Sequence, residues 1–158
     1  MKKEEAVKFF KEQVDFEYEI VKAAVKTTSG LKNLLVKELV RGIALDSAKH
    51  ANLLRALINM YESKTPFLSE EERNKIAENI RWHIELEKKA IETYKKLAEK
   101  IDNEKAKFVV LQIYEDELRH HDLLQKLYKM VVASETLTED DLWDLVWKDT
   151  AFKGGPGG

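Results

Sequence analysis

Apolar residues return every three or four positions along most of the chain, and no stretch shows the apolar-polar alternation of a strand. This helical period extends over four long stretches, and the breaks between them contain turn and capping residues. We therefore predict an all-α protein whose long helices occupy residues 4–28, 31–62, 70–100 and 104–133.

The breaks also predict how particular helices begin. In "KTPFLSEEE", Ser69 is a candidate N-cap and Glu72 completes a capping box. After the four long helices, Thr138 is expected to cap a short C-terminal helix over residues 138–149. The tail, residues 151–158, is rich in glycine and is expected to be flexible.

An internal repeat relates the two halves of the chain at an offset of 70 residues, with residues 14–60 aligned on 84–130. Matched leucines are expected of any two amphipathic helices, but the matched Glu and His residues fall on the same stripe. One polar position differs, because Ser47 stands where the second copy has Glu117. The matched polar pairs include Glu17 with Glu87, Asp46 with Asp116, and His50 with His120.

The repeat predicts that these polar side chains lie at one level. Glu87 and Glu117 are each fifteen residues from Asp102, in the predicted turn, which corresponds to about 22 Å along each helix. Glu17 and Ser47 are likewise separated from the first predicted turn by equal numbers of residues. Two hairpins in one four-helix bundle would therefore bring five ligand-type residues to a common level: Glu17, His50, Glu87, Glu117 and His120.

The two hairpins are expected to form one bundle domain over residues 1–150, with its core in 4–133. How they are connected is left open by the sequence. Residues 60–79 are either a long crossover that includes the helical segment "SEEERNKIAENI" or a tight turn between continuous helices.

Composition excludes several classes of function. The 158 residues include 27 basic and 29 acidic side chains, a net charge of -2, so we expect no nucleic acid or anionic membrane as a partner. No stretch resembles a signal peptide or a membrane-spanning helix, and we expect a cytoplasmic protein. The chain has no cysteine, so any metal must be bound by Asp, Glu or His.

A bound cation explains the polar stripe better than a set of mutually paired side chains does. Burying three carboxylates is costly without a positive charge, and none of the five ligand-type positions carries a Lys or Arg. His83 is four residues before Glu87 and is either an additional ligand or a solvent-facing histidine. Asp46 and Asp116 either accept an imidazole N–H from a neighbouring histidine or are surface carboxylates.

One glutamate from each of two helices and Glu-x-x-His from each of the other two is the ligand pattern of ferritin-like di-iron proteins. This sequence resembles that superfamily, in the neighbourhood of rubrerythrin and bacterioferritin, over roughly residues 10–132. The segment "ELEKKAIETYKKLA" is similar to the family's Glu-x-x-Ala-Ile-x-x-Tyr pattern, and "DSAKHA" is similar to Asp-Glu-x-Lys-His-Ala. The resemblance implies a ferritin-like four-helix bundle with the short C-terminal helix added.

The resemblance also implies a role for each ligand. Glu17 and His50 would be terminal ligands of one metal, Glu87 and His120 of the other, and Glu117 would bridge the two. Ser47 replaces the second bridging carboxylate, and a neutral hydroxyl is a poor ligand for divalent iron or manganese. This departure from the pattern leaves the occupancy of the first position open.

The expected cofactor is iron, in one or two ions, with manganese or zinc as alternatives. The expected chemistry is rubrerythrin-like reduction of peroxide or dioxygen, or oxidation of ferrous iron. Without cysteine the chain cannot carry its own rubredoxin centre, so a redox enzyme would need an external electron donor. The alternative is a structural or partner-binding bundle that keeps one metal or none. We expect a homo-oligomer, most simply a dimer.

Overall fold

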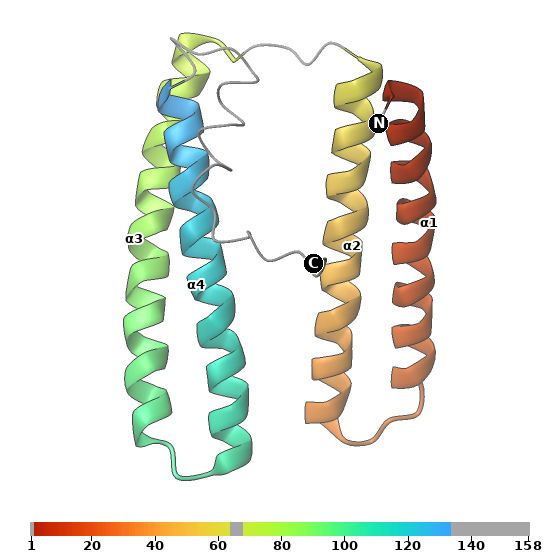
Figure 1. Ribbon diagram of the computed structural model, residues 1–158. Coiled ribbons are helices and arrows are strands. Elements are labelled where there is room, and N and C mark those ends of the chain that lie inside the picture. The colour runs from red at the N-terminus through yellow and green to blue at the C-terminus, as the bar shows by residue number, and fades with distance from the viewer. Residues whose placement is uncertain (1, 64–67, 134–158) are drawn as a thin grey trace, which may run out of the picture. The chain divides into compact units, whose positions relative to one another are not determined.

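The computed structural model describes residues 2–63 and 68–133, which form four long helices and contain no strand (Figure 1). Helix α1 packs along α2, and α3 packs along α4, so the described chain consists of two helical hairpins. The predicted all-α fold with two hairpins is confirmed. The bounds are Lys3–Thr28 for α1, Leu34–Glu62 for α2, Glu70–Lys100 for α3 and Glu104–Ala133 for α4.

Asparagine caps the second helix of each hairpin. The Asn33 side chain accepts a hydrogen bond from the Val36 N–H at 3.1 Å, so α2 begins three residues later than its apolar pattern predicts. The Asn103 side chain accepts one from the Ala106 N–H at 3.0 Å and caps α4. Asn33 and Asn103 are matched positions of the repeat, so the repeat extends to the helix caps.

The capping box predicted for α3 is confirmed. The Ser69 hydroxyl accepts a hydrogen bond from the Glu72 N–H at 3.2 Å, and Glu72 Oε2 accepts one from the Ser69 N–H at 2.8 Å. The Ser69 backbone N–H, followed by its hydroxyl, lowers the pKa of Glu72. Because α3 is continuous from Glu70, the segment "SEEERNKIAENI" opens α3 and is not a separate crossover helix. Only residues 63–69 lie between α2 and α3.

The first hairpin turns through Gly30, whose φ of 78° lies in the left-handed region that glycine adopts without strain. Above this turn, α1 and α2 enclose a small apolar core of Val7, Val14, Ala51 and Ile58. No large side chain among the described residues is completely buried. Each hairpin therefore buries one seam between its two helices and leaves other apolar side chains exposed.

Several predictions concern residues outside the described ranges. The helix predicted over residues 138–149, its cap Thr138 and the tail 151–158 belong to this group. The union of both hairpins in one domain over residues 1–150 also stays a prediction. None of the described helices is both long and apolar enough to cross a lipid bilayer.

Candidate metal centre

Three of the predicted ligands come together within the α3–α4 hairpin. One ligand atom from each of Glu87, Glu117 and His120 lies within 4.8 Å of the other two. Glu117 and His120 are one helical turn apart on α4, and Glu117 Oε2 lies 3.4 Å from His120 Nδ1. Glu87 projects from α3 at the same distance from the turn, as the fifteen-residue spacing predicts. Two carboxylates and one imidazole are a common ligand set for divalent metals.

Glu87 is the most buried carboxylate of this cluster, with only 11% of its side chain exposed. Its Oε1 atom contacts His83 Nε2 at 3.1 Å, whereas its Oε2 atom is buried and has no hydrogen-bond partner. A buried carboxylate oxygen without a partner is costly in the metal-free protein. A cation beside Oε2 would remove this cost.

Two neighbouring side chains, Glu87 and His120, shift the pKa of Glu117. Its hydrogen bond with the Glu87 side chain raises the pKa of Glu117, and burial and the negative charge of Glu87 raise it further. His120 lowers the pKa of Glu117, but by less. The pKa of Glu117 in the metal-free cluster is therefore above its ordinary value, and a metal that binds there competes with protons for this carboxylate.

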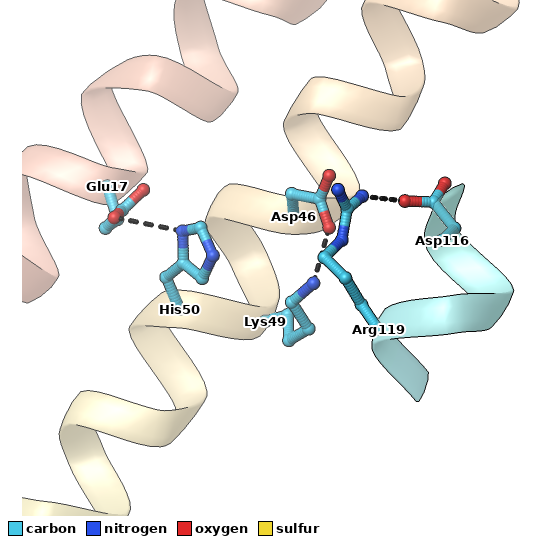
Figure 2. Close-up of polar contacts among 6 residues, drawn as sticks. All are labelled: Glu17, Asp46, Lys49, His50, Asp116 and Arg119. Carbon is cyan, nitrogen blue, oxygen red and sulfur yellow. Dashed lines mark hydrogen bonds and ion pairs between the residues drawn. The ribbon is translucent and has the colours of Figure 1, made fainter. Parts of the chain in front are cut away.

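The α1–α2 hairpin carries a smaller set of ligands at the matched positions. Figure 2 shows Glu17 of α1 facing His50 of α2, with Glu17 Oε1 at 3.3 Å from His50 Nδ1. The pair lies in a shallow groove of about 320 Å³, with leucine side chains along α2. Ser47 is buried in this hairpin and only 5% exposed, so its hydroxyl takes an interior position.

The two matched glutamates share one unusual feature. Like Glu87, Glu17 has a buried Oε2 atom without a hydrogen-bond partner, while its Oε1 atom faces a histidine. Among the described residues, the ion-pair partners of Glu17, Glu87 and Glu117 are histidines, and no Lys or Arg neutralises them. The donor set and the two partnerless oxygens therefore fit a divalent cation at each matched position.

His83 and Gln13 occupy matched positions, four residues before Glu87 and Glu17 respectively. His83 contacts Glu87, and its side chain is more than half exposed, so the two alternatives for its role remain open. Gln13 lines the groove beside Glu17 and His50, and our sequence reasoning missed it. Extending the repeat by one residue would have identified it.

Asp46 and Asp116 form ion pairs with basic residues three positions along their helices. Asp46 Oδ1 lies 2.6 Å from Lys49 Nζ, and Asp116 pairs with Arg119 (Figure 2). These contacts agree with the surface alternative, and a contact of either carboxylate with a histidine stays a prediction.

The five predicted ligands thus fall into two groups, three on the α3–α4 hairpin and two on the α1–α2 hairpin. Each group is assembled within its own hairpin. Their convergence on one centre stays a prediction, as does the bridging role of Glu117.

One comparison with known protein families gives a match. The family model for rubrerythrin matches residues 17–128, a range that begins at Glu17 and includes all five ligands. No curated protein and no solved structure gives a match. Because the family model covers well over half of the chain and both hairpins, the chain belongs to the rubrerythrin family.

Proposed function

We propose that this protein binds iron between its acidic and imidazole side chains and uses it for redox chemistry. The observation that carries the proposal is the pair of buried, partnerless oxygens on Glu17 and Glu87, at matched positions of the repeat. Each has a histidine beside its other oxygen. Membership of the rubrerythrin family supports iron over manganese or zinc.

The residues of the α3–α4 hairpin would form the stronger of two metal positions. Glu87, Glu117 and His120 supply two carboxylates and an imidazole, whereas Glu17 and His50 supply one of each. Glu117 would bridge the positions, and metal binding would compete with protonation of its carboxylate, whose pKa is raised. The neutral, buried Ser47 makes the first position weaker, because it contributes no negative charge.

Bound iron supplies one-electron oxidation and reduction, and the reaction we propose is reduction of peroxide or dioxygen coupled to oxidation of ferrous iron. The carboxylate and imidazole side chains hold the metal and balance its positive charge. The Glu117 carboxylate would bind or release a proton. The electrons must come from a separate donor, since the chain has no cysteine with which to bind a rubredoxin-type iron.

Reconstitution with ferrous iron under anaerobic conditions tests this proposal. We expect two irons per chain, followed by rapid oxidation on addition of peroxide, measured by metal analysis and optical spectroscopy. Glu117→Ala should weaken binding by more than about 100-fold, because even residues that only support metal ligands contribute about 10- to 100-fold. Glu115→Ala, an exposed carboxylate on the same helix, is the matched control. Unchanged stoichiometry and affinity in Glu117→Ala would refute the bridging role.

The buried Ser47 also supports a second candidate function, a bundle with one metal that serves a structural role. In that case wild-type protein would take up a single iron in the α3–α4 hairpin, and peroxide would not oxidise it faster than iron in solution. Metal content and oxidation rate together separate the two functions.

A further inference from the structure

Each glutamate of the candidate centre contacts one histidine. For two of the glutamates the histidine is itself a predicted ligand, and the contacts measure 3.3 and 3.4 Å. The third contact joins Glu87 Oε1 to His83 Nε2 at 3.1 Å. The matched residue of the first copy is Gln13, so the repeat of predicted ligands does not account for His83. His83 therefore has a role that the shared ligand pattern does not specify.

Helical spacing brings His83 to Glu87. The two residues are four positions apart on α3, so their side chains lie one above the other on a single face of the helix. On α4, the imidazole of His120 lies beside Glu117, which belongs to the same helix. The contact between Glu87 and His83 is thus also made within one helix, and it does not depend on how other helices pack.

His83 lies outside the group of candidate ligand atoms. Among the residues that the structure describes, the group whose ligand atoms lie within 4.8 Å of one another is Glu87, Glu117 and His120. Two ligand atoms of one ion are at most about 4.4 Å apart, since each lies about 2.0–2.2 Å from the metal. His83 contacts one oxygen of Glu87, and the other oxygen, Oε2, is buried and has no partner. One side of the carboxylate is thus occupied by His83, and the other is available to a cation.

Resting on the proposed function, we propose that His83 is a positioning residue for the metal ligand Glu87. The Nε2–H group of His83 donates a hydrogen bond to Glu87 Oε1, and Oε2 is the oxygen left for the metal. The hydrogen bond fixes the rotation of the carboxylate before metal binds, so less side-chain freedom is lost on binding. It also favours binding through one oxygen, which leaves more of the coordination sphere to Glu117 and His120.

The first copy of the repeat supports a hydrogen-bonding role over a ligand role. Gln13 lies one helical turn before Glu17 and lines the groove that contains Glu17 and His50. A glutamine amide donates hydrogen bonds as an imidazole N–H does, but it is a poorer ligand for a divalent transition metal. Both copies therefore have a hydrogen-bond donor one turn before the matched glutamate, and only the second copy has an imidazole there.

Two substitutions of His83 separate a hydrogen-bond donor from a ligand. His83→Gln keeps a donor and removes the imidazole, whereas His83→Ala removes both. Cobalt(II) added to the full-length protein is the probe, because its visible absorption reports the number and type of its ligands without a redox reaction. Competition with a chelator of known affinity measures binding. Asn79→Ala, an exposed residue one turn earlier on α3, is the matched control.

We expect His83→Ala to weaken the tighter cobalt site by about 10- to 100-fold, the usual effect of removing a group that orients a metal ligand. His83→Gln should restore most of this affinity and leave the cobalt spectrum as it is in the wild type. Asn79→Ala should bind as the wild type does. Circular dichroism should show the same helix content in all four proteins.

Wild-type affinity in His83→Ala would overturn the positioning role and leave the proposed function intact. If His83→Gln binds as weakly as His83→Ala, the hydrogen-bonding role is wrong, and a changed cobalt spectrum in both variants would identify His83 as a ligand. A wild-type protein that binds neither cobalt nor ferrous iron would refute the proposed function and the positioning role together. The expected order of cobalt affinities in a protein whose iron does not react with peroxide would refute the redox function alone.

Discussion

Replacing Glu87 by glutamine should affect the metal-free and metal-loaded protein in opposite directions. In the metal-free protein, the buried Glu87 carboxylate has one partnerless oxygen and lies near the Glu117 carboxylate. Glu87→Gln removes one of the two like charges, and its amide can donate a hydrogen bond to Glu117. The variant should therefore be more stable than the wild type without metal and less able to bind it.

The separation of the ligand atoms sets the size of the effect. Two unit charges no more than 4.8 Å apart repel by at least about 3 kcal/mol at an effective dielectric constant of about 20. The nearby imidazoles reduce this repulsion, so we expect a gain of about 1–3 kcal/mol in the unfolding free energy. For a chain of this size, each kcal/mol raises Tm by about 2–4 °C.

Thermal unfolding at pH 8, with chelator and then with excess metal, is the assay. At metal concentrations about 100 times Kd, the wild type should gain about 2.7 kcal/mol, and Glu87→Gln should lose most of this gain. Glu85→Gln, an exposed carboxylate two residues earlier, controls for the change in net charge. If Glu87→Gln destabilises the metal-free protein more than Glu85→Gln does, Glu87 is a structural partner of His83 and our reasoning is wrong.

Three further predictions follow from the same structure. Ser47→Glu should raise the iron content per chain and lower the stability of the metal-free protein, because it adds a buried charge. Ser47→Gln is the uncharged control, and equal iron content in the two variants would contradict the prediction. The pKa of Glu117 is raised from 4.5 in the folded metal-free protein, so the folded protein binds more protons than the unfolded one and its unfolding free energy should fall as pH rises from 4.5 through the raised value. Urea titrations should show a smaller fall in Glu117→Gln, and an equal fall in this variant would refute the prediction. Asn33→Ala and Asn103→Ala should each lower the unfolding free energy measured in urea by about 1 kcal/mol. An unchanged unfolding free energy would show that these caps do not stabilise the helices.

The sequence predicted the helices well, because long amphipathic stretches with few breaks leave little choice of secondary structure. The α3 bounds and the Ser69 capping box agree with the prediction, since the cap depends on residues close together in the chain. The start of α2 was predicted too early. Apolar periodicity continues through residues 31–33, but the Asn33 side chain caps the N-terminus of α2, so the helix begins at Leu34.

The candidate site was predictable as far as it depends on helical spacing and the repeat. Equal distances from the turn correctly placed Glu87 near Glu117, and Glu17 and His50 face each other as matched positions imply. The ion pair of Asp46 with Lys49 could not be chosen over a contact with histidine, because the spacing allows both. The partnerless oxygens depend on side-chain packing, about which periodicity gives no information.

A crystal structure of the iron-loaded protein, with anomalous data collected at the iron edge, tests the central claim most directly. We predict an anomalous peak within about 2.0–2.3 Å of ligand atoms from Glu87, Glu117 and His120, with a second, weaker peak beside Glu17 and His50. Iron bound only at surface carboxylates such as Asp46, with the Glu87 and Glu17 side chains free of metal, would contradict the claim.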